Sequence, residues 1–294
     1  MNAIYPSLMA DLVGIDVLPD QSVTLAAEHG FAGVDLRLTR YLGLLENYGP
    51  ERFADHMKTH GVVAGYGSML TRTLAAPADE WDHMIEQLPR IAGLAQQLGF
   101  TRAGVVVLPF DDRLDFAANR KRHLDRLAQV APVLADHGIR VGMEYVSPKT
   151  RRADATFTFV HHLEGMLELI DDAKQPNVGL MLDSFHWHAA GETVDDLTQL
   201  SPEQVVVVHI NDAPEGVPVD ELDIRNRCLP GETGVIDLDG FLGALVGMGY
   251  TGPVTSEPTN PRWPDTPAQE AAKLTGDAVC GALKRVGVVL PERS

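Results

Sequence analysis

The chain has 294 residues, 45% of them hydrophobic, and a formal net charge of -17. The charge repels phosphate backbones and so argues against a nucleic-acid partner. We find neither a signal peptide at the N-terminus nor an apolar run near the ~18 residues of a transmembrane helix, so we expect no transmembrane helix and no membrane partner. With only Cys228 and Cys280, we expect a reduced, cytoplasmic protein.

Short apolar runs alternate with helical patterns along the chain. Strands are predicted at residues 3–8, 33–37, 62–68, 102–108, 140–145, 178–183, 205–211 and 253–258. Helices are predicted at residues 22–29, 50–60, 79–98, 114–137, 159–173, 193–200, 238–248 and 267–286. Eight strand–helix units with right-handed crossovers predict an α/β fold, a single (β/α)8 TIM barrel, which we expect residues 1–294 to form as one domain.

Acidic or imidazole residues end the last four predicted strands: Glu144, Asp183, His209 and Glu257. In a parallel barrel, these strand ends face the functional mouth. Buried carboxylates need compensation, and Lys and Arg are sparse in these strands, so a cation from solution is the natural partner. Oxygen ligands with one imidazole predict a single divalent metal ion, with manganese preferred and magnesium, cobalt or zinc as alternatives.

The chain resembles the xylose isomerase-like TIM barrels, the sugar phosphate isomerase/epimerase superfamily. The resemblance covers nearly the whole chain and is strongest over residues 140–260, where the Glu–Asp–His–Glu order matches that family. The segment LDSFHWH resembles its D-x-x-H element, and HINDAP and RCLPGETGVID resemble further family elements. The resemblance implies that His186 and Arg227 contact the substrate.

The resemblance also implies a reaction. Glu144 and Glu257 would remove and return a proton alpha to a carbonyl, through an enediolate, while Asp183 and His209 mainly hold the metal. The predicted function is a divalent-metal-dependent isomerase or epimerase of a keto-sugar or keto-cyclitol. The alternative is a lyase or dehydratase of a keto-inositol or 3-keto-glycoside, with His186 as the catalytic acid. A third hypothesis, a non-catalytic sugar-binding barrel, is disfavoured because both glutamates are present.

One loop departs from the family pattern. Ketose 3-epimerases carry a further glutamate where this chain has Thr150, which disfavours a free ketohexose as substrate. Lys149 and Arg152 lie in the same loop and are predicted to bind substrate oxygens or an acidic group. The expected partner is therefore a small carbohydrate or cyclitol, and a homo-oligomer is compatible with the family.

Three further polar residues are ambiguous. Asp212 either contacts a ligand or caps its own turn. Asp35 either lines the mouth of the barrel or is a solvated strand end, and we favour the solvated strand end. His188 is expected to cap or pack, and to point away from His186 if the strand continues through both.

Overall fold

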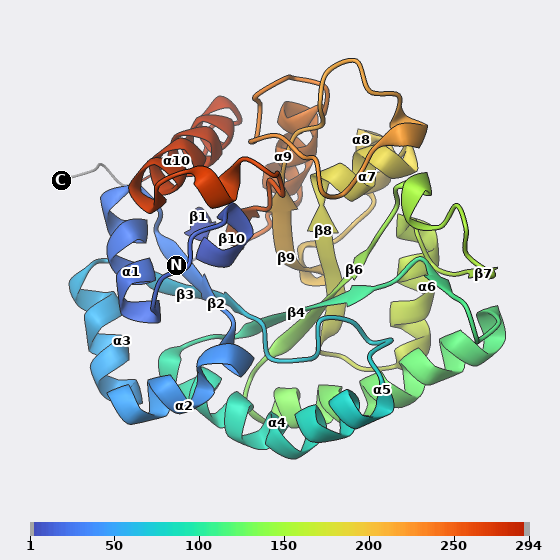
Figure 1. Cartoon of the computed structure of the whole chain (residues 1–294), viewed down its shortest axis with the longest axis horizontal. Coiled ribbons are helices and arrows are strands. Elements are labelled where there is room, and N and C mark those ends of the chain that lie inside the picture. The colour runs from blue at the N-terminus through green and yellow to red at the C-terminus, as the bar shows by residue number, and fades with distance from the viewer. Residues whose placement is uncertain (1–2, 291–294) are drawn as a thin grey trace.

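Eight parallel strands form a closed barrel in the computed structural model, which describes residues 3–290 (Figure 1). The strands are β1 (Ile4–Leu8), β2 (Gly33–Leu36), β3 (Val63–Gly67), β4 (Arg102–Val107), β6 (Arg140–Tyr145), β8 (Val178–Asp183), β9 (Val205–Ile210) and β10 (Gly252–Ser256). They pair in the order β1–β10–β9–β8–β6–β4–β3–β2, and β1 pairs with β2 to close the circle. The TIM-barrel prediction is confirmed.

Helices form an outer ring around the strands (Figure 1). They are α1 (Pro19–Glu28), α2 (Leu38–Tyr48), α3 (Pro50–Thr59), α4 (Ala78–Leu98), α5 (Phe116–Asp136), α6 (Leu163–Ala173), α7 (Ser184–Ala190), α8 (Val194–Thr198), α9 (Leu238–Met248) and α10 (Ala268–Arg285). Short 3-10 turns are η1 (Ala10–Val13), η2 (Lys149–Arg151), η3 (Pro202–Gln204), η4 (Val219–Glu221) and η5 (Trp263–Asp265). The last strand and the last helix both contact β1, so the first and last strands of the barrel are neighbours.

The structure adds elements that the sequence analysis did not predict. Helix α2 follows β2 almost directly, with Leu38, Leu42 and Leu45 on its buried side. Helix α7 begins immediately after β8 because the Asp183 carboxylate accepts bonds from the backbone amides of the first turn. A small antiparallel sheet outside the barrel pairs β5 (Phe110–Asp111) with β7 (Phe157–Thr158).

The interpretation of Asp35 as a solvated strand end is wrong. Its side chain is buried inside the barrel and accepts hydrogen bonds from Ser7 Oγ at 2.7 Å, Tyr66 N at 2.7 Å and Thr255 Oγ1 at 2.6 Å. Burial raises the pKa of Asp35, and these hydrogen bonds partly offset the increase. A Cβ at position 65 would collide with this carboxylate, so glycine is needed there.

No helix within residues 3–290 combines the length and apolar character needed to cross a membrane.

Candidate active site

Four side chains converge at the carboxyl end of the barrel. Glu144 lies in β6, Asp183 ends β8, His209 lies in β9 and Glu257 follows β10. Strand register pairs Asp183 with His209, which brings these two positions side by side. Each of the four residues offers a ligand atom, and these atoms lie within 4.8 Å of one another. The structure therefore assembles the residues that the sequence analysis selected as metal ligands.

The imidazole of His209 is oriented toward the three carboxylates. Its Nδ1 lies 3.3 Å from Glu257 Oε2, 3.6 Å from Glu144 Oε1 and 3.9 Å from Asp183 Oδ2. On the opposite side of the ring, Nε2 lies 3.1 Å from the hydroxyl of Tyr66 on β3. This second contact fixes the plane of the ring and leaves Nδ1 directed at the cluster.

Asn211 connects two of the carboxylate residues. Its side-chain amide donates to Asp183 Oδ2 at 3.1 Å, and its carbonyl oxygen accepts from Glu257 N at 2.8 Å. Asp183 Oδ1 also accepts from Phe185 N at 2.6 Å at the start of α7. These bonds hold Asp183 in one orientation and tie the chain at Glu257 to the end of β9.

Arg227 reaches the cluster from the loop between β9 and α9. Its Nη1 donates to Asp183 Oδ2 at 3.0 Å and to Glu257 Oε2 at 3.1 Å, and its guanidinium stacks 4.7 Å from the centre of the Phe185 ring. The side chain is almost completely buried. A buried guanidinium compensates carboxylate charge at short range, so Arg227 is part of the electrostatic balance of the site.

Asp212 organises the loop that carries Arg227. Its carboxylate is buried and accepts hydrogen bonds from the backbone amides of Ala213, Thr233, Gly234 and Ile236. Its backbone also pairs with Cys228, one residue beyond Arg227. Of the two sequence interpretations, these contacts favour loop capping, because the carboxylate is occupied by backbone donors from both ends of the loop.

The protein's own side chains leave the cluster with an excess of negative charge. Three carboxylates face one guanidinium, and Glu144 Oε1 is buried without a hydrogen-bond partner among the described residues. Burial raises the pKa of Glu144 to about 7. Burial opposes charge on His209 too, but its contacts with Glu144 and Glu257 prevail and raise its pKa to about 10. Metal ligation requires a neutral imidazole and ionised carboxylates, and in that state the three carboxylates exceed the charge of Arg227 by two, so the donor set fits one divalent cation.

The pKa of Glu257 shifts in the opposite direction from that of Glu144. Burial would raise its pKa, but Arg227 and His209 outweigh burial and hold the pKa of this carboxyl well below its usual range. Two glutamates at one site thus have different environments: one contacts a guanidinium, and the other does not.

His186 lies on the first turn of α7, not on a continued strand, and its side chain is buried beside the cluster. Its Nδ1 lies 3.4 Å from Ser147 N, and its Nε2 lies 3.3 Å from Arg227 Nη2. Burial lowers the pKa of His186 to about 4, so the ring is neutral and accepts at only one nitrogen. One of its two neighbouring N–H donors is therefore left without a matching acceptor. His188 is half-buried on the same helix.

Lys149 and Arg152 occupy the loop after β6. Lys149 forms an exposed ion pair with Asp220 at 2.5 Å, and Arg152 donates to the carbonyl of Ser147. Both line a depression of about 460 Å3 together with Thr150, which donates to Leu222 O at 2.7 Å. Their role as substrate ligands stays a prediction.

Tyr66 and Asn211 are site residues that sequence reasoning missed. Tyr66 is a hydroxyl-bearing residue between two glycines in an otherwise apolar strand, and Asn211 directly follows the strand that carries His209. The position of Asn211 at a strand end is a signal of the kind used for the four clustered residues.

The fold and the site together define the class of this protein: a TIM barrel with three carboxylates and one imidazole at the carboxyl end of its strands. Residues 23–277 match the family model of the xylose isomerase-like TIM barrel. The chain belongs to this family.

Curated relatives include two kinds of enzyme. Inosose isomerase from Bacillus subtilis (strain 168) is 29% identical over 207 residues, covering 68% of this chain and 71% of that protein. The 3-dehydroshikimate dehydratase of Pseudomonas aeruginosa is 32% identical over 177 residues, covering 60% of this chain but only 26% of its own length.

Solved structures share the fold over almost the whole chain. A xylose isomerase domain protein from Alicyclobacillus acidocaldarius superposes with a TM-score of 0.86 at 30% identity, covering 97% of this chain and 99% of that one. The IolI protein, whose structure contains a zinc atom, superposes with a TM-score of 0.79 at 22% identity and the same coverage.

Proposed function

We propose that this enzyme is a divalent-metal-dependent isomerase or epimerase of a keto-cyclitol or keto-sugar, acting by proton transfer alpha to a carbonyl. The observation that carries the proposal is the convergence of Glu144 and Glu257 with Asp183 and His209 on one point at the barrel mouth. The names of the inosose isomerase relatives support a cyclitol substrate.

Glu144, Asp183, His209 and Glu257 would hold the metal. When bound, a divalent ion polarises a substrate carbonyl and acidifies the neighbouring C–H group. The zinc atom in the IolI structure is compatible with such an ion, and our preference for manganese over magnesium, cobalt or zinc stays a prediction.

The two glutamates would move the proton. Glu144 Oε1 accepts no hydrogen bond from the described residues, so its lone pairs are available to a substrate proton. Glu257 Oε2 is held by Arg227, which fixes its direction across the site. A carboxylate needs to approach the carbon-bound proton within ~3 Å for transfer, and two fixed carboxylates permit removal and return.

His186 and Arg227 would contact the substrate. The two N–H donors competing around the His186 ring are better satisfied by a ligand oxygen that accepts from Arg227. Lys149 and Arg152 would contribute only if the loop after β6 exchanges its present contacts, because one is paired with Asp220 and the other with a backbone carbonyl.

A dehydratase or lyase is the second candidate. The same proton removal leads to elimination when an acid assists a leaving group at the β-carbon. His186, beside the cluster, is our candidate for this acid, and its neutral ring would first have to take up a proton. The 3-dehydroshikimate dehydratase relative favours this alternative.

The test is incubation with keto-inositols, ketoses and 3-keto-glycosides in deuterated water, with and without a chelator. We expect deuterium in recovered substrate or product, loss of exchange after chelation, and restoration by Mn2+ or Zn2+. A product lighter by water identifies the dehydratase. Absence of exchange with every ketone would contradict both candidates.

Glu257→Gln should lower turnover at least ~100-fold, the usual contribution of acid–base catalysis, without unfolding the protein. Glu215→Gln, an exposed change in the loop after β9, is the matched control. Unchanged turnover in Glu257→Gln would remove this glutamate from the reaction.

Cytoplasmic location, a single domain over 1–294 and homo-oligomer formation also stay predictions.

A further inference from the structure

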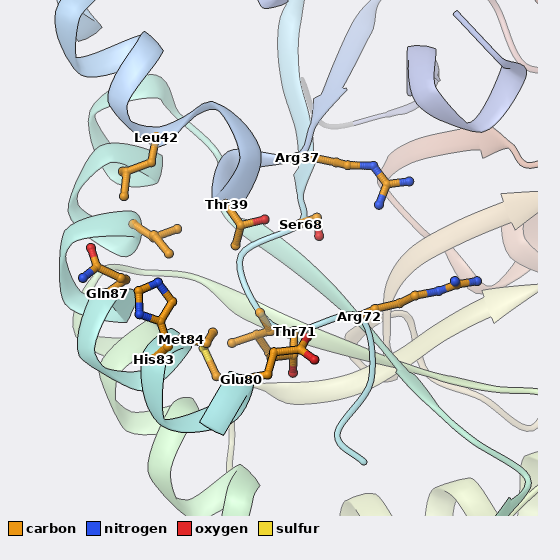
Figure 2. Close-up of a pocket in the computed structure, with 12 residues that line it drawn as sticks. Arg37, Thr39, Leu42, Ser68, Thr71, Arg72, Glu80, His83, Met84 and Gln87 are labelled. Carbon is orange, nitrogen blue, oxygen red and sulfur yellow. The ribbon is translucent and has the colours of Figure 1, made fainter. Parts of the chain in front are cut away.

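A cavity of about 490 Å3 lies beside the barrel mouth, between α2 and α4 (Figure 2). Its lining comes from the segments that directly follow β2 and β3 and from helices α2 and α4. Helices that follow barrel strands begin at the carboxyl end of the barrel, so the cavity opens on the same end as the four-residue cluster. The mechanism proposed above does not use it.

The lining is suited to a ligand group with an apolar body. Leu42, Leu70, Met84 and Ile91 provide apolar surface. The polar part of the lining comes from Thr39, Ser68, Thr71 and Gln87, together with the ionisable side chains of Glu80 and His83. The volume falls within the ~300–1,000 Å3 typical of small-molecule sites, whose linings combine apolar side chains with a few polar groups.

Two arginines form the edge of the cavity nearest the barrel. Figure 2 shows Arg37 and Arg72 extending away from the helices toward the barrel strands. Arg37 is held by Asp11, with Nε 2.5 Å from Oδ2. The guanidinium of Arg72 has no hydrogen-bond or ion-pair partner among the described residues. Arg72 is exposed, so its guanidinium is free to form a charge-assisted hydrogen bond with an acidic group of a ligand in the cavity.

The cavity is connected to the cluster through β3. Tyr66, which contacts His209, lies two residues before Ser68 of the cavity lining.

We propose that this cavity is a second substrate subsite, which takes an apolar ring or chain ending in a carboxylate that pairs with Arg72. The proposal rests on the proposed function, because it assumes a keto-carbocycle or keto-sugar at the cluster. It restricts the substrate to a ketone that carries an apolar ring or chain ending in a carboxylate.

The test uses 3-phenylpropionate and its uncharged analogue 3-phenylpropanol as probes of the cavity, titrated into the full chain by ligand-observed NMR. We expect the carboxylate to bind at least ~5-fold more tightly than the alcohol, because a charge-assisted hydrogen bond forms with Arg72. Arg72→Ala should abolish this difference. Arg52→Ala, which removes an exposed arginine from α3 outside the cavity lining, should preserve it.

Filling the cavity supplies a second readout. Gln87→Trp should weaken both probes at least ~10-fold, because the indole occupies the space that the phenyl ring requires. Gln97→Trp, the same change at an exposed position of α4 that does not line the cavity, should bind both probes as the wild type does.

The outcomes separate the subsite from the proposed function. Deuterium exchange into a free keto-cyclitol, together with probe binding that neither Arg72→Ala nor Gln87→Trp changes, would overturn the subsite and leave the function standing. Failure of exchange with all ketones, together with probe binding that depends on Arg72 and Gln87, would overturn the function and retain a binding site for an acidic apolar group.

Discussion

His209 Nε2 lies 3.1 Å from the hydroxyl of Tyr66, across the barrel from the three carboxylates that face Nδ1. The tyrosine comes from β3 and the histidine from β9, so the contact spans the barrel interior. It leaves only one ring nitrogen free for a metal. Loss of a residue that orients a metal ligand through its second nitrogen typically lowers metal affinity about 10- to 100-fold.

Tyr66→Phe should therefore weaken metal binding about 10- to 100-fold while leaving the fold intact. The measurement is calorimetric titration of the metal-free protein with Zn2+ or Mn2+. Tyr250→Phe removes a buried hydroxyl that donates to Pro253 O instead of contacting the cluster, and serves as the control. Equal metal affinity in Tyr66→Phe and wild type would contradict an orienting role.

Arg227 should contribute strongly to the stability of the metal-free protein. Removing one partner of a buried ion pair costs about 3–5 kcal/mol, because the remaining charge is left uncompensated. We expect urea denaturation of metal-free samples to give a free energy of unfolding in the order wild type, Arg227→Lys, Arg227→Ala. Lysine keeps the charge but cannot reproduce the fixed geometry of the guanidinium. An Arg227→Ala variant as stable as wild type would contradict a stabilising role for Arg227.

Asp212→Asn should loosen the loop that carries Arg227. The amide nitrogen of asparagine cannot accept the backbone hydrogen bonds that one carboxylate oxygen now receives, and each unsatisfied buried amide costs about 1–3 kcal/mol. We expect faster proteolysis within residues 213–235 and a lower kcat/KM. Asp223→Asn, at an exposed aspartate of the same loop, is the control. Proteolysis at the control rate would show that Asp212 does not hold the loop.

Burial of the Glu192 carboxylate predicts that the stability of the protein depends on pH. Its carboxylate accepts from the Tyr145 hydroxyl and from Leu163 N, both at 2.6 Å, yet burial raises its pKa from 4.5 to about 7. The folded state therefore holds this proton more tightly than the unfolded state, and the stability contributed by the protonated acid is lost as pH rises from about 4.5 to 7.

Glu192→Gln removes this titration. The free energy of unfolding of the variant should rise relative to wild type between pH 5 and pH 8, measured by urea denaturation at each pH. The same difference between variant and wild type at both pH values would contradict the expected titration.

The sequence by itself determined the barrel and the rim positions of its polar strand ends. Apolar runs of five or six residues alternate with helical periods, and repeated parallel crossovers leave closure as the natural outcome. Because parallel strands all end at one rim, Glu144, Asp183, His209 and Glu257 could be predicted to converge without knowledge of any side-chain conformation.

Only the tertiary structure decided the contacts that depend on packing between distant segments. Arg227 reaches Asp183 and Glu257 because Asp212 folds its loop back, and Tyr66 meets His209 across the barrel. The wrong interpretation of Asp35 has the same origin. Strand periodicity indicates which side of a strand a residue occupies, but it does not show that hydroxyl groups on β1 and β10 lie close enough to donate hydrogen bonds to Asp35.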